Sequence, residues 1–418
     1  MKLSRIGRVS MALVVSVAMG LGMTACGGGT IGFMWVLGTQ YNQIAGFKID
    51  DFTGNLTAMP HSPFTSGGAD PVSIVVKPGG RFIYVVNKGG GNGPTSNLPC
   101  GSAGSISEFS VGGQGVLTFQ QCFTSQGSTP VWAAVDTTGN FLYVLDQQAP
   151  SLDGAPLPAN GDITVFSIDP NTGRLTLVLN QQIKDPATGL QLTYFPVGET
   201  PTMMAVSGGC LFTLNSADQS ISPYATGTAG QLTLTTTQKF NSGAVRPTSI
   251  ITGGSGVYIT DAGAPNTNSP GQLLPFTVGA TTCSLNTITG GPVANISPAA
   301  NPVYSLVGGA GSAKNFVYVA NQSTTDTTNP NSSISAFQVQ TNGTLLAIDP
   351  GNNPYSVGAG PVCMVEDPSN QYIYTSNGDG TVTGKSISTQ GFLQDLKRGS
   401  KFTATGQATC LAVSGNVD

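Results

Sequence analysis

The sequence predicts an all-β fold assembled from seven similar units, and three observations support this prediction. One phrase, typified by GGRFIYVVN at 79–87, recurs along the chain, and its faintest copy lies at 32–38. Gly (57 residues) and Pro (27 residues) are abundant, whereas only 9% of the residues are charged. No stretch after residue 30 shows a sustained helical period of apolar residues, so short strands joined by turns are expected. Repetition of this kind indicates one large repeat architecture rather than several unrelated domains.

The N-terminal residues indicate export from the cytoplasm. A basic start, MKLSRIGR, precedes an apolar run from Val9 to Met23, and Cys26 follows Met23-Thr24-Ala25. This ending resembles the bacterial lipobox, in which the cysteine is lipidated and becomes the mature N-terminus. An uncleaved anchor and an ordinary signal peptide are the alternatives, although an apolar run of about 15 residues is shorter than the roughly 20 that span a membrane.

These features predict the order of segments along the chain. We expect a signal peptide at 1–25, a Gly-rich tether at 26–32 and the repeats at 33–418, with lipidated Cys26 holding the protein to a membrane. The absence of Asp after Cys26 favours the outer membrane, so the expected location is the cell envelope, in the periplasm or at the outer-membrane surface. Cleavage removes three of the 16 basic residues and leaves 13 against 20 acidic ones. This acidic balance argues against nucleic acid as a partner, and we expect a monomer.

Six cysteines follow Cys26, and export permits disulfide bonds. Cys100 and Cys122 lie in one repeat and are the expected pair. Cys363 and Cys410 occupy equivalent positions of two repeats, so we expect their side chains to point the same way around the ring. We do not expect a bond between these two.

Each unit contains four predicted strands in a fixed order. The second strand is the recurring phrase, which is apolar on nearly every residue. The third carries apolar residues three apart, as in SISEF at 105–109, and the fourth follows a Gly turn such as Gly173. In the fifth unit, Cys283 stands where the other units have this Gly. The first strands begin with a proline, namely Pro71, Pro130, Pro201, Pro247, Pro302 and Pro361.

Packing requirements turn these strands into a ring. Because the second strand is apolar throughout, both of its faces need cover, as in a sheet between two neighbouring sheets. Four-stranded antiparallel sheets stacked around an axis meet this need in the β-propeller. The seventh first strand is missing at the start of the chain, but GQATCLAVSG at 406–415 matches GPVCMVEDP at 360–368. We therefore predict a seven-bladed β-propeller that closes when the C-terminal strand pairs into the first blade.

The second strand ends in Asn or Asp in six units. Such side chains on one side of a ring are candidates for ligand binding, but Asn and Asp at strand ends also bond to neighbouring backbone in turns. Six repeats of the same role favour the structural interpretation. The residues concerned are Asn87, Asp146, Asn215, Asp261, Asn321 and Asn377.

Loop length distinguishes one side of the ring. Connections between the first and second strands, and between the third and fourth, are short. Antiparallel order places the long connections on the opposite side, the long-loop face, which is the candidate binding surface because variable loops on a rigid scaffold usually carry function. Tolerated decoration without a function is the alternative. The long segments are 59–70, 88–104, 147–161, 182–200, 262–271, 289–301, 322–332 and 349–360.

The Gly-x-Phe-x-Tyr-Val-x-Asn phrase, the I-x-x-F strand and the DPNTGRL turn at 169–175 resemble the lactonase-type seven-bladed propellers. This family includes bacterial 6-phosphogluconolactonases and fungal carboxymuconate-lactonising enzymes, and the resemblance covers residues 33–418. It implies the propeller fold. Enzymes of the family carry Pro-Arg-His at the head of a blade and Asn-Glu after its second strand, a cluster suited to polarising a lactone carbonyl. Here no blade head has Arg-His and no Glu follows the strand-end Asn or Asp, so the cluster has no counterpart.

The remaining candidates are titratable residues of the long-loop face. Lactone hydrolysis requires a water activated by a base and stabilisation of the developing oxyanion. Glu199 and Arg246, each close before the proline of a first strand, are the candidate catalytic pair. A plain surface role is the alternative for all of them. The candidate ligand-binding residues are Asp70, Lys88 and His61.

Two functional hypotheses follow. The first is a lipid-anchored propeller that binds a small sugar-type ligand or a protein partner through its long-loop face. The second is a divergent lactonase that uses Glu199 and Arg246. The missing Arg-His and Glu favour the first, and a purely structural role in the envelope is a third. No zinc spacing, nucleophile elbow or phosphate-binding Gly loop is present, so no metal and no cofactor are expected.

Overall fold

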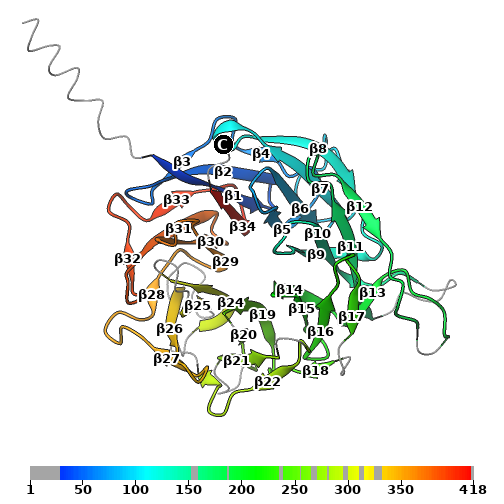
Figure 1. The fold of residues 1–418 in the computed structure, drawn as a ribbon. Coiled ribbons are helices and arrows are strands. Elements are labelled where there is room, and N and C mark those ends of the chain that lie inside the picture. Colours follow the sequence, from blue (N-terminus) through cyan, green and yellow to red (C-terminus); the bar gives the residue numbers. More distant parts are fainter. Residues whose placement is uncertain are drawn as a thin grey trace, which may run out of the picture.

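The computed structural model describes residues 29–151, 159–185, 188–234, 239–254, 256–264, 271–279, 282–294, 300–309, 315–323 and 332–415. Within these residues the fold is all-β, apart from one turn of 3-10 helix, η1 (Gly113–Gly115). Seven antiparallel sheets stand around a central axis, which makes the chain a seven-bladed β-propeller as predicted (Figure 1). Nowhere in the described ranges is there a helix with the length and hydropathy that a membrane crossing requires.

Every blade has the same four strands from the axis outward, and the blades are numbered here from the N-terminus. The innermost strands of blades 1 to 7 are β34 (Ala408–Gly415), β5 (Pro71–Val76), β9 (Ser128–Val135), β14 (Pro201–Ser207), β19 (Pro247–Gly253), β24 (Ala300–Gly308) and β29 (Pro361–Glu366). The second strands are β1 (Thr30–Gly38), β6 (Phe82–Asn87), β10 (Phe141–Gln148), β15 (Cys210–Asn215), β20 (Gly256–Asp261), β25 (Phe316–Ser323) and β30 (Tyr372–Asn377). The third strands are β2 (Gln43–Asp50), β7 (Ser105–Val111), β11 (Asn160–Ile168), β16 (Ser220–Thr226), β21 (Gln272–Val278), β26 (Ser333–Val339) and β31 (Thr381–Ile387). The outer strands are β3 (Leu56–Ala58), β8 (Leu117–Phe123), β12 (Leu175–Val178), β17 (Leu232–Leu234), β22 (Leu285–Thr287), β27 (Leu345–Ala347) and β32 (Leu393–Asp395).

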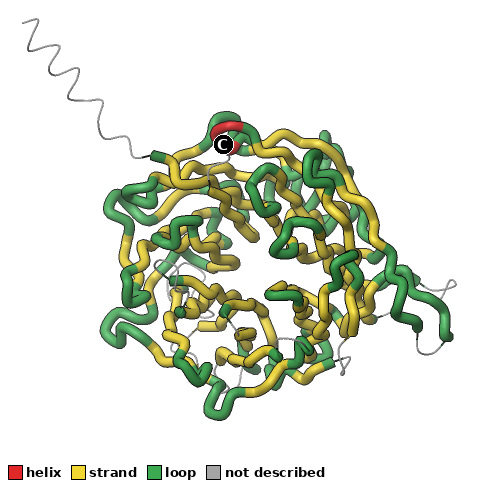
Figure 2. Tube along the Cα trace, viewed as in Figure 1, coloured by secondary structure: helices red, strands yellow, loops and turns green. Residues whose placement is uncertain are grey.

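Six blades add a short fifth strand beside the third strand, on the outer side of the sheet. Blade 2 differs, because its outer strand β8 is longer and pairs along nearly the whole of β7. The connection from β12 to the fifth strand of blade 3 extends beyond the ring (Figure 2). The fifth strands are β4 (Phe64–Thr65), β13 (Phe195–Glu199), β18 (Phe240–Asn241), β23 (Val293–Ala294), β28 (Tyr355–Ser356) and β33 (Lys401–Thr403).

The ring closes in blade 1, where the C-terminal strand β34 lies beside β1 near the axis (Figure 1). Trp35 is opposite Ala412 and Val36 is opposite Leu411, so the predicted closure by strand pairing is confirmed. Strand β1 begins at Thr30. The last residues of the expected tether at 26–32 therefore belong to the propeller, because they pair with β2 and β34.

Contacts between neighbouring blades explain the recurring phrase. In blade 2, Phe82 packs on the turn glycine of blade 3, since a Cβ added to Gly173 would lie 2.4 Å from the Phe82 ring. Gly173 also has a φ of 76°, a conformation that favours glycine. The buried Tyr84 donates its hydroxyl to the carbonyl oxygen of Gly173 at 2.5 Å. The same bond recurs from Tyr318 to Gly391 at 3.0 Å and from Tyr374 to Gly54 at 2.6 Å. In blades 2, 6 and 7 the phrase thus joins its blade to the next one.

Candidate functional site

The candidate site is the mouth of the central channel on the long-loop face. Here the residue before an innermost strand meets the residue that follows the second strand of the same blade. Backbone bonds from the latter to the former fix the pairs, as from Lys88 N to Asp70 O at 2.9 Å and from Ala262 N to Arg246 O at 2.9 Å. We call these residues the mouth ring. For blades 1 to 7 they are Gln407 and Thr39, Asp70 and Lys88, Thr129 and Gln147, Thr200 and Ser216, Arg246 and Ala262, Asn301 and Gln322, and Gly360 and Gly378.

Charges in the mouth ring are few. Asp70 and Lys88 lie together at the head of blade 2, as their backbone bond shows. Burial raises the pKa of Asp70, and the positive charge of Lys88 partly opposes that shift. Arg246, in blade 5, is the third charged member, three blades away around the ring. The other positions are hydroxyls, amides or small residues, so the mouth is mainly neutral and polar.

The candidate catalytic pair lies on the long-loop side, but its two members do not contact each other. Glu199 ends β13, two residues before Pro201 at the start of β14, and its backbone N–H donates to Asp218 Oδ2 at 3.3 Å. Arg246 precedes β19 and donates from Nη2 to the carbonyl oxygen of Ala262 at 3.4 Å. Both side chains are exposed, and no hydrogen bond or ion pair between them occurs in the described part of the chain. An acid and a cation are therefore present near the mouth without being organised as a pair.

The structure places His61 away from the mouth. It lies between β3 and β4, and both of these strands pair with β2 on the outer side of blade 1. Strands β1 and β2 separate it from the innermost strand β34. The expectation that His61 shares a surface with the mouth residues is not met, because the chain reaches the long-loop face only after β4, which follows His61 in the sequence. Cys26, the expected lipidation site, lies outside the described residues.

Below the mouth, two aromatic side chains meet in the centre of the ring. Trp132 on β9 and Tyr304 on β24 come from blades that face each other across the axis, and their ring centroids are 6.5 Å apart. Both occupy the second position after the proline of the innermost strand. In the lactonase-type enzymes that the sequence resembles, this position would carry the histidine of Pro-Arg-His. Here these positions hold Ser73, Trp132, Met203, Ser249, Tyr304 and Cys363.

The corresponding residue of blade 1 is Cys410, and it forms a disulfide with Cys363, with a Cα–Cα distance of 5.1 Å. The prediction that these two cysteines do not bridge is wrong. They do point the same way in their blades, but the innermost strands β29 and β34 are neighbours beside the narrow axis. Side chains of like orientation therefore meet there.

A cavity of about 520 Å³ continues the channel on the other side of the aromatic pair. Its walls come from all seven innermost strands and are mostly Val, Ile, Ala, Leu and Met. Asp136 and Thr137 line its end at the short turns, where Asp136 already accepts hydrogen bonds from Thr138 and Phe141. The described lining residues therefore offer apolar contacts and, beyond the hydrogen-bonded Asp136, no acid or base.

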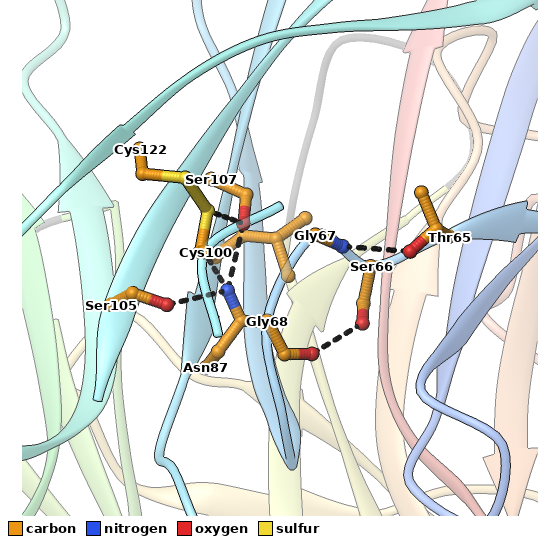
Figure 3. The surroundings of a disulfide bond; sticks show 10 residues. Thr65, Ser66, Gly67, Gly68, Asn87, Cys100, Ser105, Ser107 and Cys122 are labelled. Carbon is orange, nitrogen blue, oxygen red and sulfur yellow. Dashed lines mark hydrogen bonds between the residues drawn. A yellow bond between two sulfur atoms is a disulfide. The ribbon is translucent and has the colours of Figure 1, made fainter. Parts of the chain in front are cut away.

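The long loop 88–104 is fixed to the scaffold by the Cys100–Cys122 disulfide, the pair expected from the sequence (Figure 3). Cys100 also donates its backbone N–H to Gly67 O at 2.8 Å. Beside it, the buried Asn87 donates from Nδ2 to the hydroxyls of Ser107 at 2.8 Å and Ser105 at 3.4 Å (Figure 3). This Asn lock joins the end of the second strand to a Ser-x-Ser at the start of the third.

The lock recurs, which supports the structural interpretation of the strand-end Asn residues. Asn215 donates to Ser220 and Ser222, both at 3.0 Å, and Asn377 donates to Thr381 and Thr383, both at 3.1 Å. All of these Asn side chains are fully buried. They are therefore not available to a ligand at the mouth.

We predict that Asn87→Ala destabilises the protein by about 1–3 kcal/mol, because two buried hydroxyls lose their donor. Chemical denaturation followed by fluorescence measures the change. Asn92→Ala, an exposed position of the same loop region, is the matched control and should change stability little. Equal effects of the two substitutions would contradict the lock.

Two features of the structure were not predicted from the sequence. One is the disulfide between Cys210 and Cys283, with a Cα–Cα distance of 5.5 Å. Cys210 stands where other repeats have an aromatic residue and Cys283 where they have the turn glycine, so the paired exceptions were a signal for it. The other is the contact between Asp146 and Asp162, which are opposite each other on β10 and β11. Across the described ranges no group of three or more His, Cys, Asp or Glu residues is placed to hold a metal ion.

The family described as Lactonase, 7-bladed beta-propeller, matches residues 30–190. No curated protein matches the chain by sequence. Solved structures with the same fold include a putative 6-phosphogluconolactonase from Bacteroides fragilis (17% identity, TM-score 0.64, covering 92% of this chain and 98% of that one). The periplasmic gluconolactonase of Pseudomonas aeruginosa aligns with 14% identity and a TM-score of 0.65, over 92% of this chain and 99% of that one. A Lactobacillus plantarum protein aligns with 14% identity and a TM-score of 0.65, over 92% and 100%. The expected resemblance to lactonase-type propellers is confirmed, and at these identities the structures establish the fold alone.

Proposed function

We propose that this lactonase-like propeller is an exported binding protein, anchored in the cell envelope through lipidated Cys26, that holds its ligand at the mouth on the long-loop face. One observation carries the proposal: the centre of the ring is occupied by the Trp132–Tyr304 contact and the Cys363–Cys410 disulfide. The positions from which family enzymes would present a histidine thus hold no base. None of the described side chains at these positions can activate a water molecule as a general base.

The composition of the mouth ring favours a small sugar-type ligand. Its amide side chains, Gln147, Asn301, Gln322 and Gln407, can each donate and accept hydrogen bonds, as a hydroxyl-rich molecule requires. Asp70 and Lys88 add one charge of each sign at blade 2. A protein partner that uses the same surface is the other occupant, and the experiment below separates the two.

A divergent lactonase is the second candidate function. Glu199 and Arg246 favour it, because an exposed carboxylate and an exposed guanidinium lie near the starts of the adjacent innermost strands β14 and β19. The similarity in fold to a protein named as a gluconolactonase is in keeping with this candidate. Catalysis would require a substrate to bring the two side chains together, because they do not contact each other without it.

A hydrolysis screen of residues 30–418 against plain and phosphorylated sugar lactones tests the proposal. We expect ring opening at the uncatalysed rate for the wild type and equally for Glu199→Gln and Arg246→Ala. Catalysed hydrolysis that falls in either variant would replace the binding proposal with the lactonase.

Thermal shifts with the same lactones and their open acids then test binding. A stabilising ligand should lose its effect in Lys88→Ala and in Asp70→Asn. Lys77→Ala is the matched control, because Lys77 lies at the short turn after β5 on the opposite face. Loss of the shift in Lys77→Ala alone would place the binding site on the face opposite the long-loop face. The absence of a thermal shift with every sugar would favour a protein partner.

A further inference from the structure

Blade 3 departs from the Asn lock in a chemically specific way. Asp146 stands at the Asn position, and Asp162-x-Thr164 stands at the position of Ser-x-Ser. Asp146 and Asp162 are directly opposite on paired strands, and both are fully buried. Cβ atoms of such pairs lie roughly 4.5–5.5 Å apart. Where the other locks place an amide donor against two hydroxyls, blade 3 therefore places one acid against another.

The hydrogen bonds of the two acids are unequal. Asp146 accepts from Ser125 Oγ at 2.6 Å and from the backbone N–H of Gly127. A single hydroxyl, Thr164 Oγ1, lies 3.5 Å from Asp146 Oδ2 and 3.4 Å from Asp162 Oδ2. Asp162 Oδ1 has no hydrogen-bond partner among the described residues. The donors thus support a charge on Asp146 and leave Asp162 without support for one.

Two ionised carboxylates in this place would have no compensating cation among the described residues. Within that part of the chain, the titratable groups facing the pair from other elements are Tyr194, from the segment before β13, and Tyr224 on β16, and neither supplies a positive charge. Burial raises the pKa of Asp146 to about 7, and no Lys or Arg charge lowers it. Burial, and then the charge of Asp146, raises the pKa of Asp162 well above its usual value. Like charges this close cannot both form in a buried site at low cost.

We propose that Asp162 holds a proton in the folded protein at neutral pH and shares it with Asp146, so that blade 3 contains a proton-binding latch beside the mouth. The latch joins two segments that lead to the mouth. Ser125 and Gly127 belong to the segment before β9, while Asp162 is paired with Pro196 and Asn160 with Glu199 in β13. Loss of the proton leaves two negative charges between these segments and weakens the contacts that hold both of them. The latch does not depend on which ligand the mouth binds.

The sign of the pH dependence follows from proton linkage. In the unfolded chain both acids titrate near their usual pKa of 3.8. The folded chain keeps a proton that the unfolded chain has lost, so raising the pH favours unfolding. The stabilisation is complete below about pH 4 and disappears as the pH rises through the raised pKa of the folded pair. Between these limits the unfolding constant should rise by about tenfold per pH unit.

The test compares thermal and denaturant unfolding of the full chain from pH 5 to pH 9 at constant ionic strength. Asp162→Asn restores a permanent donor at the same size, so we expect this variant to lose the part of the pH slope that the acid pair contributes and to unfold with an about tenfold smaller constant than wild type at pH 8. Asp162→Ser introduces the residue that other blades have at this position, and it replaces Asp162→Asn in the test if that variant does not fold. Glu108 in blade 2 is also buried with its pKa raised to about 7, so the difference between variants, rather than the wild-type slope, is the readout.

Asp261→Asn is the matched control. Asp261 occupies in blade 5 the repeat position that Asp146 occupies in blade 3, and it is equally buried, but it accepts from the N–H groups of Val245 and Arg246 and from Gln272. Its replacement should destabilise the protein, which is the opposite sign to Asp162→Asn. ¹³C NMR of labelled Asp carboxyl carbons should show one Asp still protonated at pH 6 in wild type and none in Asp162→Asn.

Two results would overturn the proposal. One is an unchanged pH slope and stability in Asp162→Asn together with no protonated Asp signal at pH 6. The other is a rise in wild-type stability at pH 8 on addition of Ca²⁺, absent from Asp162→Asn, which would assign the two carboxylates to a metal ion instead of a proton.

Discussion

A chain that ends at residue 406, before β34, is expected to lose cooperative unfolding and to aggregate. Strand β34 is the innermost strand of blade 1, and without it β1 has an unpaired edge at the axis. Trp35 and Met34 are fully buried, and Leu411 is nearly so. Burial of each large apolar side chain contributes about 1.5–3 kcal/mol. The free energy lost when all of these side chains become exposed is comparable with the free energy of unfolding of a whole domain, which is about 5–15 kcal/mol.

Calorimetry of the truncated and full chains measures this effect. The matched control ends at Gly415, keeps all of β34 and should unfold like the full chain. A synthetic peptide of residues 404–415 should restore part of the lost transition, because closure is by strand pairing. An unaltered transition in the truncated chain without the peptide would show that β34 does not hold the ring closed.

The number of blades and the mode of closure were predictable because repeats expose what every blade needs. Phe82, Tyr84 and Asn87 belong to one copy of the recurring phrase, and each contacts a residue that also recurs in the repeat. Phe82 and Tyr84 contact the turn Gly173, and Asn87 contacts Ser107. Because the contacting residues recur together with the phrase, the sequence specifies how neighbouring blades pack against each other. The fold could therefore be derived from the chain alone.

The site was less predictable, because it depends on distances between blades that the repeat does not encode. Cys363 and Cys410 looked too alike to bond, yet their strands converge at the axis. His61 looked close to the mouth in sequence, but β4 returns the chain to the face only after it. Arg246 has its guanidinium turned to Ala262 in its own blade, and nothing in the local sequence gives that orientation. The acid pair of blade 3 was visible as two exceptions to the repeat, but their meeting required the register of β10 and β11.

The second large effect is expected from the disulfide between Cys210 and Cys283, which joins blade 4 to the turn of blade 5. Removing a crosslink that closes a loop of 73 residues should cost about 4 kcal/mol in the double variant Cys210→Ala/Cys283→Ala. Other blades show which pair of residues can replace this disulfide. At the same two positions other blades pair an aromatic ring with a glycine, as in Phe141 with Gly230. Cys283 already has a φ of 50°, a conformation that glycine adopts without strain.

Cys210→Phe/Cys283→Gly should therefore regain about 2–3 kcal/mol of the loss, since a buried Phe replaces the crosslink. Denaturant unfolding of wild type and the two double variants, each with and without reducing agent, measures the comparison. The difference between the variants should persist under reduction, because neither has this crosslink. A Phe/Gly variant no more stable than the Ala/Ala variant would mean that the aromatic–glycine contact is not interchangeable with the disulfide. The seam between blades 4 and 5 would then be held by its covalent bond in a geometry different from that of the other seams.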